Sequence, residues 1–117
     1  MSSFFLPGGE SKRIALAGAA EIPTQGKTCR VLFSTSAGRL VLVGMPAHYE
    51  WKEHAAPNHT LVQVISGQCE IRLDNRAEAL NAGDLFYVRP DLAHSITARQ
   101  PTLLLLSLFR TDEPQPT

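Results

Sequence analysis

Short hydrophobic runs recur along the whole chain, and glycine, proline, asparagine or aspartate separates each run from the next. The runs are rich in Val, Ile, Leu, Phe and Thr, and none of them repeats at the helical period of about 3.6 residues. This pattern is typical of an all-β sandwich or barrel. It predicts strands at residues 14–17, 28–34, 39–45, 60–66, 69–73, 77–80, 85–89, 95–98 and 102–110.

The breaks between these runs have the chemistry of tight turns. Segments 36–38, 66–68, 74–76 and 81–84 contain glycine, asparagine or aspartate, which tolerate a positive φ or bond to their own backbone. Strands joined by such short links pair antiparallel. We therefore expect the two strands on either side of each of these turns to pair antiparallel.

The length of 117 residues suits one domain with one hydrophobic core. We expect residues 13–110 to form that domain. Residues 1–12 contain glycine and no clear strand pattern, and residues 111–117 hold two prolines and two acids. These two segments are expected to be a loose N-terminal segment and a flexible C-terminal tail.

Charge and composition limit the classes of partner that the protein could bind. Lys+Arg and Asp+Glu both number 11, so the formal net charge is zero and no basic field exists to hold a nucleic acid. The first residues lack the basic start and long apolar run of a secretion signal. The most apolar stretch, residues 103–109, is far shorter than the roughly 20 residues of a membrane-spanning helix. We therefore expect a cytoplasmic protein without a membrane partner.

Two histidines stand near strand ends although they are far apart in the sequence. His54 lies in segment 48–67 and His94 in segment 83–98, and 15 residues separate the two segments. A small β-barrel would bring the two side chains together. Because the neutral imidazole ring donates a lone pair, both residues are candidate metal ligands. Cys29 and Cys69 lack the close spacing of a zinc or redox pair and are interpreted as reduced thiols.

The spacing of the first segment resembles the first motif of the cupin superfamily. That motif runs Gly, five residues, His, one, His, three or four, Glu, six, Gly. With Gly67 in the final glycine position, Thr60 takes the glutamate position and Ala56 the second histidine position. His54 takes the first histidine position and His48 the opening glycine position.

The second segment resembles the second cupin motif, which runs Gly, five, Pro, one, Gly, two, His, three, Asn. Gly83 opens it, Arg89 takes the proline position and Asp91 the second glycine position. His94 matches the histidine, and Ala98 replaces the asparagine.

The resemblance implies a double-stranded β-helix, or jelly-roll barrel, of two antiparallel sheets with a pocket between them. In cupins this pocket usually holds divalent iron, manganese, zinc or nickel, bound by three histidines and a glutamate. This chain keeps only His54 and His94 of those four, so any divalent metal (Zn, Ni, Fe or Mn) is expected at low occupancy.

An alternative register would complete the site differently. Strand side chains alternate between two faces, so the cupin spacing turns Thr60 into the pocket and His59 away from it. A shift of one residue would instead bring His59 and Gln63 inward beside His54 and His94, giving a site of three nitrogens and one oxygen.

Other residues are candidates for the pocket lining. Trp51 and Tyr87 offer aromatic surfaces for a ligand, although aromatic residues in small barrels are more often core or interface. His48 could act as an acid or base, or be a solvated loop residue. Arg72 and Arg89 could recognise a carboxylate through a bidentate contact, or mark an exposed strand face.

Three functions remain open at this point, and the third, a structural partner within a larger assembly, is indicated only by apolar strand faces. The first is a module that binds a small-molecule ligand in a pocket that has lost the usual metal ligands. The second is a metal-dependent enzyme, of the dioxygenase, isomerase or cyclase type, that acts on a small polar organic substrate. In either case the apolar residues on both faces of 60–66 and 102–107 predict a homodimer that covers the second face.

Overall fold

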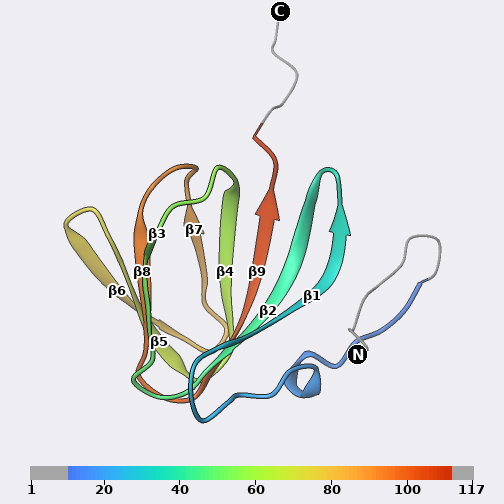
Figure 1. The fold of residues 1–117 in the computed structure, drawn as a ribbon, viewed down its shortest axis with the longest axis horizontal. Helices are drawn as coiled ribbons and strands as arrows, with labels where there is room; N and C mark the ends of the chain where they lie inside the picture. Colours follow the sequence, from blue (N-terminus) through green and yellow to red (C-terminus); the bar gives the residue numbers. More distant parts are fainter. Residues whose placement is uncertain (1–10, 112–117) are drawn as a thin grey trace, which may run out of the picture.

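In the computed structural model, residues 11–111 are described, and they form nine β-strands and one short 3-10 helix (Figure 1). The helix, η1, spans Leu16–Gly18. The strands are β1 Thr28–Thr35, β2 Gly38–Met45, β3 Glu50–His54, β4 His59–Ser66, β5 Gln68–Leu73, β6 Arg76–Asn81, β7 Leu85–Val88, β8 His94–Ala98 and β9 Thr102–Phe109.

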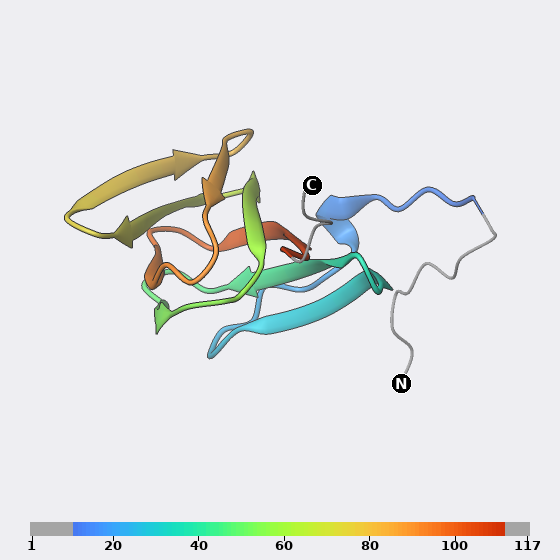
Figure 2. The ribbon, with the colours of Figure 1, turned by 90° about the horizontal axis from the view of Figure 1, so that it is seen from above.

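The strands form two antiparallel sheets, which confirms the predicted all-β jelly roll. One sheet has five strands in the order β1-β2-β9-β4-β7, and the other has four in the order β3-β8-β5-β6. Strands that are neighbours in a sheet are mostly far apart in the sequence, as in β2 beside β9 and β5 beside β8. The pairing expected across the links 66–68 and 81–84 is wrong, because each of these links joins strands of different sheets. Figure 2 shows from above that the two sheets face each other.

Alternation along each strand builds the core between the sheets. In β4 the side chains of Thr60, Val62 and Val64 are buried, whereas Gln63 is exposed. The same rule holds in the facing sheet, where Cys69, Ile71 and Leu73 of β5 are buried. The main core is therefore the interior of the barrel, and each strand contributes every second residue to it.

Two strand predictions need correction. Residues 14–17 were expected to form a strand, but Gly18 and Ala19 donate backbone hydrogen bonds to Ala15 and Leu16 in a helical turn. The apolar side chains of this segment pack with Leu42 and Leu103 on the outer face of the five-stranded sheet. They are apolar because they cover the sheet, although their backbone does not pair with any strand. Strand β3 was not predicted, because its sequence EWKEH is mostly charged. The other eight predicted strands are confirmed within one or two residues.

The glycine turn between β4 and β5 is fixed by a close backbone approach. Gly67 has φ 91°, and a Cβ atom placed there would collide with the carbonyl oxygen of Pro101. Only glycine fits both constraints. This turn therefore holds the end of β4 against the start of β9.

Most of the expected loose ends, 1–12 and 111–117, lie outside the described residues. None of the helical segments within 11–111 is long and apolar enough to cross a membrane.

Candidate functional site

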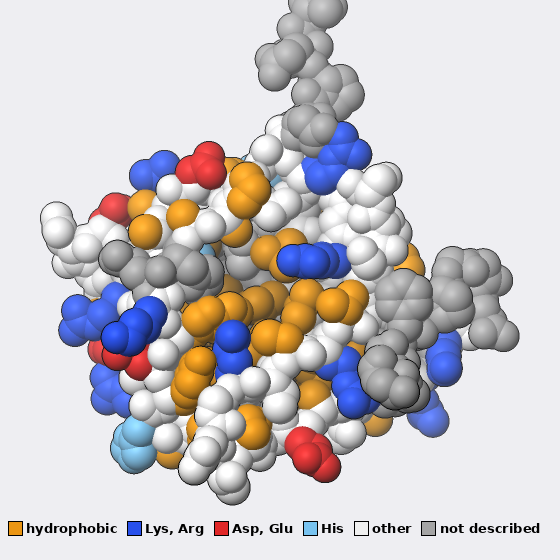
Figure 3. All heavy atoms as spheres, viewed as in Figure 1, with side chains coloured by type: hydrophobic (Ala, Val, Ile, Leu, Met, Phe, Trp, Pro, Cys, Tyr) orange, Lys and Arg blue, Asp and Glu red, His pale blue; other side chains and the backbone are white. Residues whose placement is uncertain are grey.

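A cavity of about 340 Å³ opens between the two sheets. Its walls are mainly aliphatic side chains from both sheets. They include Val31, Val41, Val43, Val62, Ile96 and Leu106. Figure 3 shows hydrophobic side chains gathered in this recess, with Lys and Arg side chains beside it.

The polar groups of the cavity come from the first residues of three strands. Arg39 of β2, Thr60 of β4 and His94 of β8 all line it. Arg39 pairs with Leu108 and Leu108 pairs with Thr60, so the three form one row across the five-stranded sheet. Two strand spacings, roughly 10 Å, separate Arg39 from Thr60. His94 faces this row from the opposite sheet, which makes one end of the cavity polar.

The observed register turns Thr60 inward, as the cupin spacing predicts. Its side chain is 4% exposed. Its hydroxyl has no hydrogen-bond partner among the residues that the structure describes. His59 lies on the outer face, where its Nδ1 and the Tyr87 hydroxyl are 2.7 Å apart, and Gln63 is exposed. The shifted register, with His59 and Gln63 in the pocket, is therefore not the one that the protein adopts.

His94 is held in one orientation by its own loop. Its side chain is 3% exposed, and its Nδ1 lies 3.0 Å from the carbonyl oxygen of Leu92. Because a carbonyl oxygen only accepts, Nδ1 must carry the proton, and in the neutral ring Nε2 is then the acceptor. The backbone of His94 pairs with that of His54. The side chain of His54 lies outside the described part of the structure.

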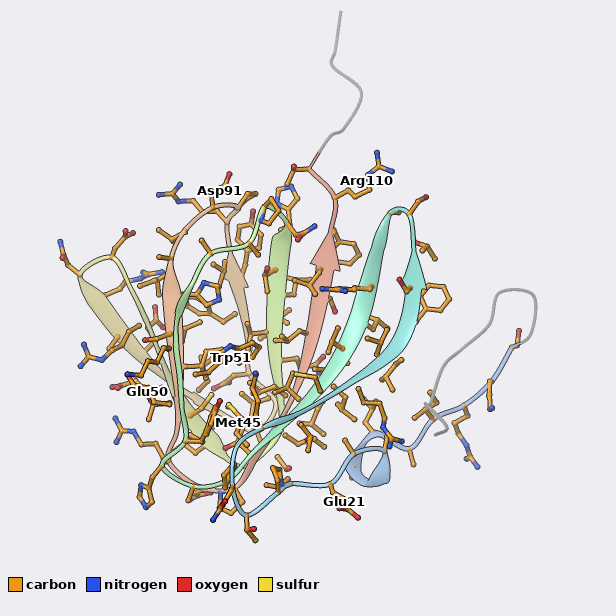
Figure 4. The ribbon with its side chains drawn as sticks, viewed as in Figure 1. Glu21, Met45, Glu50, Trp51, Asp91 and Arg110 are labelled. Atoms are coloured by element: carbon orange, nitrogen blue, oxygen red, sulfur yellow. The ribbon has the colours of Figure 1, made fainter. Side chains whose placement is uncertain are left out.

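Trp51 forms the aromatic wall of the cavity. It pairs with Ile96 across β3 and β8, and its neighbour Glu50 points away from the barrel (Figure 4). The ammonium nitrogen of Lys27 lies 5.0 Å from the centroid of the Trp51 ring, within the range of a cation–π contact. A second cation besides Arg39 therefore lies next to a residue of the cavity wall.

Three other candidates do not line the cavity. His48 and Arg89 are exposed, and Tyr87 lies on the outer face of the five-stranded sheet, where it is 49% exposed. Tyr87 is absent from the lining because it alternates with the inward residues Phe86 and Val88 on β7. Arg72 is also exposed, and its Nε lies 3.5 Å from a Glu70 carboxylate oxygen on the outer side of β5.

The backbone nevertheless keeps the shape of both cupin motifs. Each of their four glycine positions has a positive φ, including the two that are not glycine. The values are 71° at His48, 91° at Gly67, 95° at Gly83 and 63° at Asp91. A positive φ at a residue with a Cβ atom is uncommon, so the spacing marks real turns and not a chance match.

The donor set does not suit the divalent ion that the cupin resemblance implies. Ala56 lines the cavity but has no ligating atom, and Thr60 offers a neutral hydroxyl where the motif has a carboxylate. Within residues 11–111, apart from the side chains left undescribed, no group of three or more His, Cys, Asp or Glu lies together. We therefore derive no chemical step through a metal.

The two cysteines have opposite environments, and both are free thiols. Cys29 is exposed and lines the cavity from β1. Cys69 is fully buried in the core, and burial raises the pKa of its thiol from 9.0 to about 11. Only Cys29 is therefore placed to react with a reagent or to meet a ligand.

Comparison with known protein families shows to which family the chain belongs. The family described as "AraC-like ligand binding domain" matches residues 37–109, which covers the barrel from β2 to β9. The chain belongs to this family. Membership in the AraC-like family also confirms the resemblance to the cupin superfamily, since the matched residues include both motifs completely. A search of curated proteins found no match.

Solved structures share the fold of this AraC-like domain at low sequence identity. A conserved protein of unknown function from Streptococcus pyogenes is 18% identical over 97% of this chain and 98% of its own, with a TM-score of 0.81. A cupin superfamily protein from Desulfitobacterium hafniense is 17% identical, over 87% and 94%, also with a TM-score of 0.81. An RmlC-like cupin from Desulfovibrio desulfuricans is 16% identical, over 86% and 97%, with a TM-score of 0.77. Identities this low show the fold alone.

Sequence reasoning missed three residues of the site. Arg39 is in phase with the buried Val41 and Val43, and a charge in phase with a buried strand face is a signal that could have found it. Cys29, which lines the cavity, and Lys27, which lies over the Trp51 ring, gave no such signal, because their positions depend on how β1 is added to the edge of the sheet.

Proposed function

We propose that this domain is a binding module that takes a small, mostly apolar organic molecule into the cavity between its sheets. The observation that carries the proposal is the cavity itself, which is open to solvent yet lined mainly by aliphatic side chains and Trp51. Ligand sites of this kind combine an apolar wall with a few polar groups that orient the ligand. Arg39, Thr60 and His94 are those groups here.

Size and polarity limit the ligand. A volume of about 340 Å³ equals that of roughly 11 waters at about 30 Å³ each, so a single ring with a short chain would fill it. A polyhydroxylated molecule would bury more hydroxyl groups than these few polar side chains can bond, and each unpaired group is costly. The lining therefore favours an apolar ligand over a sugar-like one.

The test uses the single tryptophan as a reporter, since Trp51 lines the cavity. Phenylpropanol and octanol, both neutral, are titrated while the emission of Trp51 is followed. Ala56→Phe places a ring in the cavity, and Ala55→Phe is the matched control on an exposed neighbour. We expect saturable binding by the wild type and by Ala55→Phe, weakened at least tenfold in Ala56→Phe. Equal binding by all three proteins, or no saturable change with either compound, would contradict the proposal.

A metal-dependent enzyme is the second candidate, and one observation favours it. His94 donates its Nδ1 proton to a backbone carbonyl, as metal-binding histidines usually do. Elemental analysis of protein purified without chelator or nickel resin separates the two functions. We expect well under one equivalent of Zn, Ni, Fe or Mn, unchanged by His94→Ala. Near-stoichiometric metal that is lost in His94→Ala would instead favour the enzyme. The cytoplasmic location expected from the sequence stays a prediction.

A further inference from the structure

We infer that the ligand class of this cavity is a small apolar carboxylic acid whose carboxylate binds at Arg39 while its hydrocarbon part fills the aliphatic interior. This inference rests on the proposed function and adds the chemical identity of the ligand's polar end. The argument depends on Arg39, the one charged residue in the described lining of the cavity.

Arg39 is the centre of that argument. It lies on the strand face that lines the cavity, and its side chain is exposed at the rim. Its guanidinium has neither an ion pair nor a hydrogen bond among the residues that the structure describes. The described ion pairs all join other arginines to Glu70 or Glu78, away from the cavity. Arg39 is therefore available to a ligand.

Lys27, which does not itself line the cavity, adds a second positive charge beside one of its walls. The ammonium group of Lys27 lies over Trp51, 5.0 Å from the ring centroid. No Asp or Glu belongs to the described lining of the cavity. A cationic ligand would meet repulsion here, whereas the planar fork of a guanidinium matches a carboxylate in shape and charge.

The polar end of the cavity also provides two further hydrogen-bonding side chains. Thr60 lies in the same row across the five-stranded sheet as Arg39, and His94 faces that row from the other sheet. Beyond this row the walls are Val41, Val43, Val62 and Ile96, which bond to nothing polar. An acid can therefore place its charged group at the rim, partly in water, and bury only its hydrocarbon part. This placement avoids the desolvation cost of a buried charge.

The experiment compares two ligands of equal size. Phenylpropionate and phenylpropionamide differ in charge but hardly in shape, and each is titrated against the Trp51 emission at neutral pH. We expect the carboxylate to bind about five- to tenfold more tightly than the amide in the wild type. In Arg39→Gln the two should bind within twofold of each other, because only the carboxylate loses affinity. Arg72→Gln makes the same charge change on the outer side of β5 and should keep the preference.

Any other result of these titrations would overturn the inference. Equal binding of acid and amide to the wild type would overturn the inference and leave the proposed function intact. A preference that persists in Arg39→Gln, or that falls equally in Arg72→Gln, would also overturn it, because Arg39 would then not be the group that binds the carboxylate. If neither compound binds, the inference fails, and the titration with neutral alcohols decides the proposed function separately.

Discussion

Thr60 shows how strongly one side chain affects the metal-binding chemistry of this barrel. It stands where a metal-binding cupin carries glutamate, its side chain points into the cavity, and it brings no charge to offset a cation. Ala56 likewise replaces a histidine. The two substitutions leave the shape of the motif turns unchanged, so they alter the chemistry of the pocket without altering the fold.

Restoring the missing ligands should restore metal binding. In Ala56→His with Thr60→Glu, His94 gains an imidazole and a carboxylate as neighbours in the cavity, which is a usual donor set for Zn²⁺. We expect the metal-free double variant to be about 1–3 kcal/mol less stable than the wild type, because it buries a carboxylate without a partner. Zn²⁺ should recover that stability in thermal denaturation and bind in calorimetry. A double variant that binds Zn²⁺ no better than the wild type would contradict this account of the pocket.

The two thiols should differ sharply in reactivity. At pH 8 we expect Ellman's reagent to modify Cys29 quickly and Cys69 only after unfolding, because Cys69 is buried and its pKa is raised to about 11. The same shift predicts a pH effect on stability. Folding keeps the Cys69 thiol protonated, so its contribution is complete below pH 9 and is lost as the pH rises towards about 11. The stability of Cys69→Ala should depend less on pH in that window. Two equally fast thiols would contradict the burial of Cys69.

At the scale of elements, the turns position the site. The β4–β5 turn at Gly67 holds the end of β4 beside β9, and this fixes the register that turns Thr60 inward. Hydrophobic alternation and turn glycines were enough to predict eight strands. Alternation failed for β3, whose charged residues lie on an edge strand, and for residues 14–17, whose apolar side chains cover a sheet without joining it.

Two glycines provide a matched test of the turn. Both Gly67 and Gly83 have a positive φ, but a Cβ atom meets the Pro101 carbonyl oxygen at Gly67 and open space at Gly83. We expect Gly83→Ala to cost about 1 kcal/mol of unfolding free energy, from conformation alone, and Gly67→Ala to cost at least about 2 kcal/mol. Urea denaturation measures both. Equal losses would mean that the close approach to Pro101 does not constrain the turn.

At the scale of the whole molecule, the cavity brings together residues that no local pattern connects. Arg39 and His94 are 55 positions apart in the sequence (94 minus 39), and they line one pocket because β2 and β8 belong to facing sheets. The cupin spacing was enough to predict the inward Thr60 and the pocket position of His94. It could not predict the positive charges of Arg39 and Lys27, because both residues lie outside the two motifs.

The homodimer expected from the sequence remains a prediction, and the structure narrows the surface involved. Residues 14–22 cover part of the outer face of the five-stranded sheet, while Leu85, Tyr87 and Phe109 remain 61%, 49% and 45% exposed. We expect sedimentation at micromolar concentration to show a dimer, and Leu85→Asp to give a monomer because it places a charge in the apolar contact. Ala79→Asp, on the exposed side of β6, should stay dimeric. A wild-type monomer would contradict the prediction.

The central claim is that a ligand enters the space between the sheets, and a methyl NMR spectrum with bound phenylpropionate tests it most directly. Ile96 and Val62 line the cavity, whereas Leu85 and Ile14 lie on the outer face of the five-stranded sheet. We predict that saturating phenylpropionate shifts the methyl signals of Ile96 and Val62 and leaves those of Leu85 and Ile14 in place. Shifts confined to Leu85 and Ile14, with Ile96 and Val62 unchanged, would contradict the claim.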